Sequence, residues 1–192
     1  MKPTLQLAAC LLPALLLGCV GHQDTAELLR RYNQAANRHD IPTLSAMSAD
    51  DIVWVLGRDT LIGKEAALGP NELDAAVGAR LTIKSFVVKG DTVEFVLEEA
   101  NQIMDTLGMP SLIHYVRFVF RDGLLVRKEP VHPDIVPPAA DSIAQPWHRW
   151  IRSAHPEVWT QIMKPDGRVN FSRQTGELLL RLSREWKQSM GK

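Results

Sequence analysis

Cysteine, aromatic residues and net charge are all scarce in this chain of 192 residues. The two cysteines, Cys10 and Cys19, both lie near the N-terminus, so the rest of the chain can form no disulfide bond. Lysine and arginine together number 22, as do aspartate and glutamate, which leaves no excess positive charge to bind a nucleic acid backbone. We therefore expect a fold held together by its hydrophobic core, without a nucleic acid partner.

The sequence also lacks the common motifs for metals and cofactors. Its six histidines show neither HxxxH nor HExxH spacing, and there is no glycine-rich phosphate loop and no GxSxG nucleophile elbow. The two cysteines belong to the N-terminal segment and are not expected to be free for a metal. We therefore predict no metal site and no cofactor.

The longest hydrophobic run, over residues 5–20, follows a basic N-terminal tip. It is shorter than the ~20 apolar residues needed to span a bilayer, and its position is typical of a secretory signal. The run ends in Leu16-Leu17-Gly18-Cys19, which resembles the lipobox of bacterial lipoproteins. The resemblance implies that residues 1–18 are a signal peptide and that Cys19 carries the lipid.

An acylated Cys19 would anchor the protein to a lipid bilayer. Val20, in place of aspartate, resembles the enterobacterial sorting signal for the outer membrane, so we expect a protein on that membrane that faces the periplasm. A plain signal peptide with an incidental cysteine, or an uncleaved anchor, is the alternative interpretation.

The remaining sequence has the composition of a globular protein, with 45% hydrophobic and 23% charged residues. Helical spacing of hydrophobic residues predicts one helix over residues 24–39, a short second helix from Pro42, and a third helical stretch from Gly63 that is interrupted at Gly69-Pro70. Strands are predicted over residues 51–56, 81–88, 92–103, 112–120 and 124–129, with a loop at 105–110. Helices followed by a run of strands predict an α+β fold.

The region after the last predicted strand is rich first in proline and then in tryptophan. Five prolines between Pro130 and Pro146 predict an extended connector over residues 131–146. Residues 147–192 hold four of the five tryptophans at helical spacing, which predicts a helical C-terminal extension. Its hydrophobic faces predict packing against the preceding domain or against a second copy of the chain, as in a homodimer.

Four segments between residues 24 and 130 occur in a characteristic order and spacing. They are YNQAANRHD (32–40), DDIVW (50–54), LIGKEA (61–66) and FVFRDGL (118–124). Together they resemble the nuclear transport factor 2-like superfamily, in particular its SnoaL-like polyketide-cyclase branch. The resemblance implies a cone-shaped domain over residues 19–130, in which a curved antiparallel sheet packs on N-terminal helices around a pocket. Such pockets serve isomerisation, cyclisation, hydrolysis, ligand binding or partner docking, so the fold does not fix the function.

Strand alternation predicts which side chains face this pocket. A three-residue loop at 121–123 would pair Phe118 with Val126, and the preceding hairpin would pair Phe118 with Leu97. On this register the inner face of the sheet becomes polar at the end remote from the loop. The polar side chains expected there are Glu99, Asn101, His114 and Lys128.

This polar end has three interpretations. Glu99 and His114 could act as a catalytic acid and base, with Asn101 or Tyr32 as an oxyanion donor. Alternatively, Glu99 and Lys128 form a cross-strand salt bridge, and His114 is a half-buried histidine without a catalytic role. The third interpretation is a pocket that binds a ligand without catalysis. Its ligand-binding side chains would be Tyr32, Trp54, Phe95, Asn101, Phe118 and Lys128.

One departure from the superfamily weighs against a known activity. Its catalytic members usually place an aspartate at the base position of the cone, and no aspartate falls on the predicted inner face of the sheet. We therefore expect an envelope lipoprotein that binds a small apolar ligand or a protein partner. The alternative is an isomerase, cyclase or hydrolase that uses Glu99 and His114.

Overall fold

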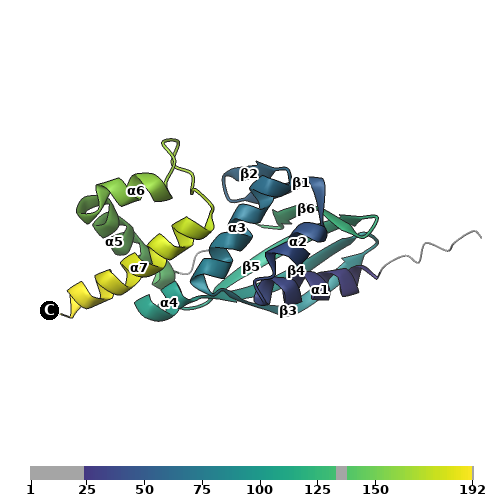
Figure 1. Ribbon diagram of the computed structural model, residues 1–192. Coiled ribbons are helices and arrows are strands. Elements are labelled where there is room, and N and C mark those ends of the chain that lie inside the picture. Colours follow the sequence, from purple (N-terminus) through teal and green to yellow (C-terminus); the bar gives the residue numbers. More distant parts are fainter. Residues whose placement is uncertain (1–23, 133–137, 192) are drawn as a thin grey trace, which may run out of the picture.

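A curved sheet covered by helices lies beside a group of C-terminal helices in the computed structural model (Figure 1). The structure describes residues 24–132 and 138–191. The predicted signal peptide and Cys19 lie outside these residues, so the lipid anchor remains a prediction.

The N-terminal helices begin where the sequence predicts them. Helix α1 (Thr25–Asn37) is capped by Asp24, whose side chain accepts a hydrogen bond from the backbone N–H of Ala26. Helix α2 (Ile41–Ala46) is capped by Asp40 in the same way. Helix α3 (Lys64–Val77) runs through Gly69-Pro70 without a break, so the predicted interruption there is wrong. This continuity brings the second half of α3 over the sheet (Figure 1).

Six strands form a single sheet in the order β2-β1-β6-β5-β4-β3. They are β1 (Ser48–Leu56), β2 (Asp59–Ile62), β3 (Arg80–Lys89), β4 (Thr92–Ala100), β5 (Leu112–Arg121) and β6 (Leu124–Pro130). Neighbouring strands pair antiparallel, except that β1 and β6 run parallel, so the sheet is mixed rather than purely antiparallel. The predicted α+β fold, a curved sheet packed on helices with a helical C-terminal extension, is confirmed (Figure 1).

The strand register differs from the predicted one by two residues between β5 and β6, and by four residues between β4 and β5. Phe118 pairs with Lys128 rather than Val126, and with Val93 rather than Leu97. The turn between β5 and β6 has two residues instead of three, both with positive φ, and a bulge follows it. Because shifts of two and of four residues both preserve alternation, the side chains keep their predicted faces.

The predicted strand over residues 92–103 ends early. Asn101 caps a short helix, α4 (Gln102–Leu107), by accepting a hydrogen bond from the backbone N–H of Met104 at 3.0 Å. Asparagine is favoured at this position because its side chain replaces a missing intrahelical acceptor. Asn101 therefore lies beyond the end of the strand, and the first part of the loop predicted at 105–110 is helical.

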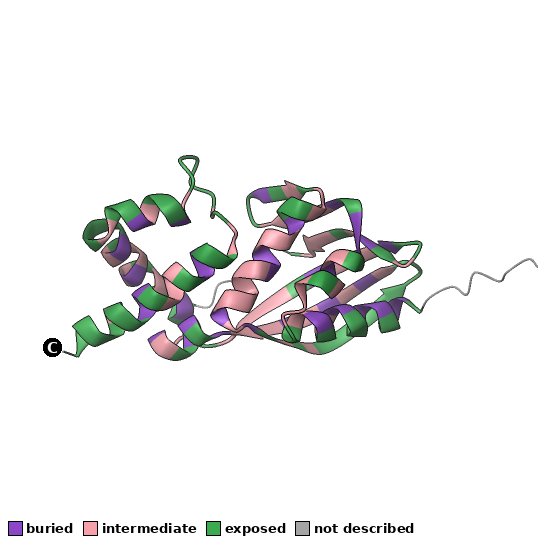
Figure 2. Ribbon diagram, in the orientation of Figure 1, coloured by how far each residue is buried: buried purple, intermediate pink, exposed green. Residues whose placement is uncertain are grey.

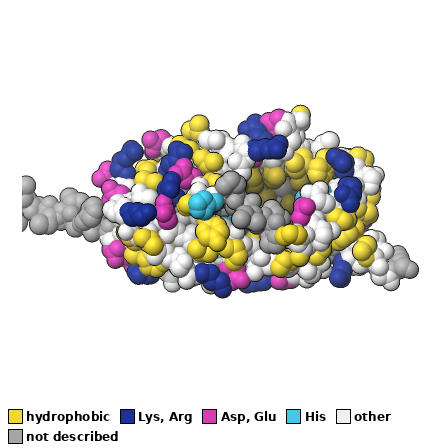
Figure 3. Space-filling view, turned by 180° about the vertical axis from the view of Figure 1, so that it is seen from behind, with side chains coloured by type: hydrophobic (Ala, Val, Ile, Leu, Met, Phe, Trp, Pro, Cys, Tyr) yellow, Lys and Arg dark blue, Asp and Glu magenta, His cyan; other side chains and the backbone are white. Residues whose placement is uncertain are grey.

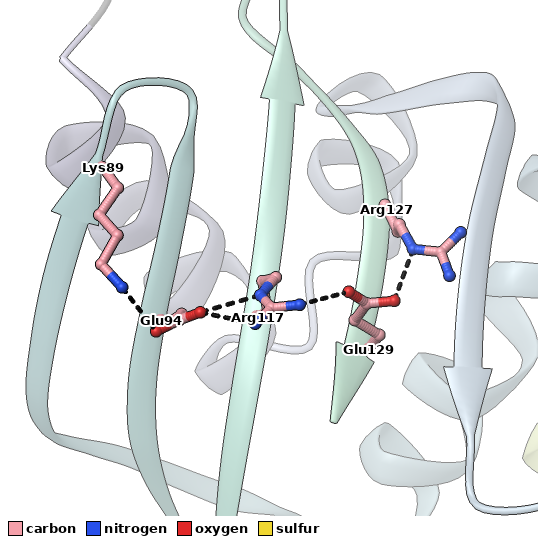
Figure 4. A network of polar contacts seen from close by, with 5 residues as sticks. All are labelled: Lys89, Glu94, Arg117, Arg127 and Glu129. Carbon is pink, nitrogen blue, oxygen red and sulfur yellow. Dashed lines mark hydrogen bonds and ion pairs between the residues drawn. The ribbon is translucent and has the colours of Figure 1, made fainter. Parts of the chain in front are cut away.

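The face of the sheet turned away from α1 carries a chain of ion pairs across strands β3 to β6 (Figure 4). Arg117 lies between two directly opposite carboxylates, that of Glu94 at 2.7 Å and that of Glu129 at 3.0 Å. Lys89 extends the chain at one end and Arg127 at the other. Partly exposed ion pairs contribute little to stability, but alternating charges on adjacent strands favour this register over others.

Two clusters of buried hydrophobic side chains hold the molecule together (Figure 2). The first fills the space between α1, α2 and the inner face of the sheet, and includes Leu29, Ile52 and Val93. The second joins the end of α3 and α4 to the C-terminal helices, and includes Leu107 and Leu182. The C-terminal extension is therefore part of the folded core.

Three helices make up this extension: α5 (Pro138–Ala154), α6 (Pro156–Ile162) and α7 (Arg173–Met190). Helix α5 begins inside the predicted connector, so the prediction of extended chain over residues 138–146 is wrong. Pro138 is tolerated because a proline in the first turn of a helix removes no intrahelical hydrogen bond. The division of the chain into domains at residues 130 and 146 remains a prediction.

Helix α7 packs directly on α3 and α4. Gly176 allows the close approach, because a Cβ atom at this position would lie 2.7 Å from the Cβ atom of Ala76 and 2.9 Å from the carbonyl oxygen of Leu73. Gly69 of α3 similarly makes room for Phe171, whose carbonyl oxygen would lie 2.6 Å from an added Cβ atom. The extension therefore packs against the preceding domain, and the homodimer remains a prediction.

Candidate functional site

A cavity of about 320 Å³ lies between α3, the inner face of the sheet and the segment that leads into α7. Its walls are mainly hydrophobic and include Trp54, Leu73, Leu97, Val116, Pro130 and Phe171. Seen from behind, the surface of the molecule is hollowed, and yellow hydrophobic side chains line the hollow (Figure 3). A volume of this size suits a small organic molecule.

Four titratable side chains reach this cavity from four different elements. Asp74 belongs to α3, Glu99 to β4, His114 to β5 and Lys128 to β6. His114 Nε2 lies 3.3 Å from Glu99 Oε2, and the two side chains are only 21% and 22% exposed. The structure thus brings together three of the four polar residues predicted at this end of the sheet, and adds Asp74.

Asn101, the fourth predicted polar residue, acts on the cavity indirectly. While its oxygen caps α4, its Nδ2 atom donates a hydrogen bond to Glu99 Oε1 at 3.2 Å. Asn101 is buried beside the cavity rather than in its wall. It can therefore orient the carboxylate of Glu99, but the structure does not place it as an oxyanion donor inside the cavity.

Lys128 packs on aromatic rings. Its Nζ atom lies 3.5 Å from the centre of the Trp54 ring, and 5.5 and 6.0 Å from the centres of the Phe118 and Tyr32 rings. An ammonium group over an indole face is stabilised by cation–π attraction. Burial lowers the pKa of Lys128, while the nearby carboxylates of Asp74 and Glu99 oppose this effect.

The cross-strand salt bridge considered between Glu99 and Lys128 is not formed in the described structure. Glu99 instead lies beside His114, and Lys128 lies over Trp54. Strand β5 separates β4 from β6 in the sheet, so the two residues are not on adjacent strands. The salt-bridge part of that interpretation is therefore wrong, while a half-buried His114 without a catalytic role stays open.

Asp74 brings an aspartate to the cavity that was not predicted, although the expectation concerned only the inner face of the sheet. The carboxylate comes from helix α3, not from the sheet, and it lies three residues after buried Asn71 and three before buried Val77. This spacing places Asp74 on the buried face of a continuous helix. Burial raises the pKa of Asp74 to about 7, and the charge of Glu99 adds to the effect, while Lys128 and His114 oppose it.

The aromatic residues predicted to bind a ligand lie mainly in the core beside the cavity. The Phe118 ring packs edge-on against the rings of Tyr32 and Phe95, with centres 5.1 and 4.9 Å apart. These three side chains line a neighbouring space of about 20 Å³, which holds at most about one water molecule. Of the predicted ligand-binding residues, Trp54 and Lys128 line the main cavity.

Phe171 is a wall residue that the sequence does not predict, because it belongs to the C-terminal extension. The segment before α7 is held in place from both sides: Arg168 contacts the carboxylate of Asp59 in β2 at 3.5 Å, and Ser172 caps α7. No local sequence pattern indicates that this segment returns to the pocket. The cavity is therefore completed by residues far apart in the chain.

No three histidine, cysteine, aspartate or glutamate side chains in residues 24–132 and 138–191 gather closely enough to hold a metal ion. Every helix in this part of the chain is too short or too polar to traverse a lipid bilayer.

Asp74→Asn is expected to make the protein more stable at pH 8 than the wild type, by about 1–3 kcal/mol, with little difference at pH 4. Because the folded-state pKa lies above the ordinary value of 3.8, the native state keeps a proton that the unfolded state releases. The free energy of unfolding therefore falls as the pH rises from about 4 to about 7. Urea unfolding of both proteins across this range measures the effect, and an identical pH dependence would contradict it.

The sequence matches no family model and no curated protein sequence. Among solved structures, the chain is similar to a nuclear transport factor 2-like protein of unknown function from Cytophaga hutchinsonii, with a TM-score of 0.47 and 10% identity. The matched region covers 55% of this chain and 87% of that protein. A protein from Kribbella flavida provisionally assigned as a ketosteroid isomerase has a TM-score of 0.48 and 20% identity. The match covers 62% of this chain and 86% of that protein. A provisionally assigned SnoaL-like polyketide cyclase from Jannaschia sp. has a TM-score of 0.47 and 15% identity. The match covers 55% of this chain and 82% of that protein. These likenesses concern the fold alone.

Proposed function

We propose that the cavity binds a small, mainly hydrophobic organic molecule that carries one polar group. The observation that supports this function is the combination of hydrophobic walls with four titratable side chains at one end of a cavity of about 320 Å³. Burial of the hydrophobic part of a ligand would contribute roughly 25 cal/mol per Å² of apolar surface removed from water. The polar end would fix the orientation of the ligand.

Native mass spectrometry of the full-length protein, purified from its own host, tests this proposal. We expect a bound molecule in the wild type, and its loss in Val116→Trp, because Val116 lines the cavity and an indole there would fill the space. Tyr115→Trp is the matched control, since Tyr115 is 43% exposed and does not line the cavity. A bound molecule that survives in Val116→Trp, with unchanged thermal stability, would place the ligand elsewhere.

The lipobox-like segment that ends at Cys19 supports a membrane-anchored form of this binding protein. On this proposal the acyl chains hold the protein at the outer membrane, and the folded part faces the periplasm.

Cys19→Ser is expected to release the protein from membrane fractions or to leave it as an uncleaved precursor, because serine cannot carry the thioether-linked lipid. Cell fractionation and intact-mass measurement check this result. Cys10→Ser is the control, since Cys10 would leave with the signal peptide. An unmodified Cys19 in membrane-bound protein would contradict the lipid anchor.

Acid–base catalysis is the second candidate function. It is favoured by the 3.3 Å approach of His114 to Glu99 within the cavity, and by the carboxyl of Asp74, whose pKa burial raises to about 7. The two candidates differ in the fate of the bound molecule. If the protein only binds, the extracted ligand is unchanged after incubation with fresh protein. If the protein is an isomerase, cyclase or hydrolase, incubation changes the mass or the chromatographic retention time of the ligand, and Glu99→Gln abolishes this change.

A further inference from the structure

The ammonium group of Lys128 has no hydrogen-bond acceptor among the described residues, 24–132 and 138–191. Its contacts there are the faces of aromatic rings, with Trp54 the nearest at 3.5 Å, and it forms no ion pair with the carboxylates whose charges act on it. An ammonium group has three N–H donors, and Lys128 lines the main cavity. These donors can be satisfied only from within the cavity, by solvent or by a ligand.

The other polar groups at this end of the cavity can also act as donors. A protonated Asp74 carboxyl donates its O–H, and the imidazole of His114 is held beside Glu99, 3.3 Å away. Of the other acidic groups that line the cavity, Glu99 lies beside His114, and Glu129 is paired with Arg117 and Arg127. In the described structure, neither of these carboxylates forms an ion pair with Lys128.

We infer that the polar group of the ligand is a carboxylate, that it binds to Lys128, and that Asp74 is protonated in the complex. This inference rests on the proposed function and names its class of ligand. A carboxylate supplies two acceptor oxygens to donors that otherwise lack one, and a charge-assisted hydrogen bond to an ammonium group is about twice as strong as a neutral one. The stack on Trp54 already holds Lys128 in place, which reduces the entropy lost on binding.

The same charges disfavour other ligand classes. An ammonium ligand would be repelled by Lys128, and a neutral amide, although its carbonyl can accept a hydrogen bond, would lack the attraction between opposite charges. An ionised Asp74 would repel a carboxylate, so binding is linked to proton uptake at Asp74. The groups whose charges act on Asp74 are Glu99, His114 and Lys128. Two nearby carboxylates are already paired, Asp59 of β2 with Arg168 and Asp50 of β1 with Lys64.

Three probes with one carbon skeleton test the ligand class: 1-naphthylacetate, 1-naphthylacetamide and 2-(1-naphthyl)ethylamine. Isothermal titration calorimetry with the full-length protein at pH 6 is expected to show the carboxylate binding at least about tenfold more tightly than either of the others. Equal or tighter binding of the amide or the amine would overturn the inference and leave the proposed function standing. Failure of all three probes to bind would contradict both.

Two variants, one of them a control, test whether Lys128 causes the preference for the carboxylate probe. Lys128→Met is expected to reduce the preference for the carboxylate over the amide to about twofold or less, and to leave amide binding within about threefold of the wild type. Lys84→Met is the control, because Lys84 lies outside the cavity and pairs with Glu98. A carboxylate preference that persists in Lys128→Met would overturn the assignment.

The pH dependence tests the role of Asp74 without changing Lys128. Affinity of the wild type for 1-naphthylacetate is expected to fall by up to about tenfold per pH unit above neutral pH, because the complex takes up a proton that free protein has released. Asp74→Asn carries a permanently neutral donor, so its affinity is expected to change much less over the same range. Equal pH dependence in the two proteins would show that Asp74 is not protonated on binding.

Discussion

Replacing Gly176 with valine is expected to lower the free energy of unfolding by about 3 kcal/mol or more, measured by urea denaturation. An added Cβ atom would lie 2.7 Å from the Cβ atom of Ala76 and 2.9 Å from the carbonyl oxygen of Leu73. Non-bonded carbon atoms pack at about 3.5–4.0 Å, so α7 must move away from α3. Leu73 and Asp74 are neighbours on α3, and any compensating movement of this helix would also disturb the cavity.

Gly176→Ala separates this packing effect from helix propensity. Alanine is better than glycine in a helix interior by about 1 kcal/mol, which acts against the clash. Since the clash involves the backbone of α3 as well as a side chain, we expect the alanine variant to be less stable than the wild type. Gln174→Ala, on the exposed face of the same turn, is the control and should change stability by less than about 0.5 kcal/mol. A more stable Gly176→Ala would show that the two helices have room between them.

The faces of the strands could be predicted from the sequence, whereas their exact pairing could not. Val93, Phe95, Val116 and Phe118 alternate with charged or exposed residues, and this period of two fixes which side each one buries. The pairing of strands depends on the turn and on the bulge that follows it, and neither leaves a hydrophobic signature. The pairing is displaced by two residues between β5 and β6 and by four between β4 and β5, and because both numbers are even, Glu99, His114 and Lys128 lie on the predicted face.

Asp74 and Phe171 could not be predicted in the same way, for two different reasons. Asp74 and buried Val77 both lie after Gly69-Pro70, so their helical spacing can be read from the sequence, but the sequence does not show that this face of α3 lies over the sheet. Phe171 has no such signal, because its place in the wall depends on how α7 docks on α3, which involves contacts distant in sequence. Tyr32 and Phe95 fill the core beside the cavity, since alternation alone cannot distinguish a core side chain from a pocket wall.

Ending the chain after Pro138 is expected to abolish soluble monomeric protein. The removed helices cover Val77, Ala79, Ile103 and Leu107, which are all buried in the complete chain. A large apolar side chain contributes about 1.5–3 kcal/mol when it is fully buried, so exposing this group costs a substantial part of the 5–15 kcal/mol that stabilises a typical domain. Light scattering and thermal unfolding of the shortened protein, beside the lipid-free full-length form, measure the result.

A shorter deletion shows whether the loss comes from the docked helices or from truncation itself. Removal of residues 191–192 leaves all three helices intact and is expected to change neither solubility nor melting temperature. The deletion after Pro138 also removes Phe171, so any folded remainder should bind 1-naphthylacetate more weakly, because one wall of the cavity is missing. A shortened protein that is monomeric, equally stable and equally able to bind would make the extension an independent appendage. The buried contacts of Leu182 and Ile151 with the end of α3 and with α4 argue for the opposite result.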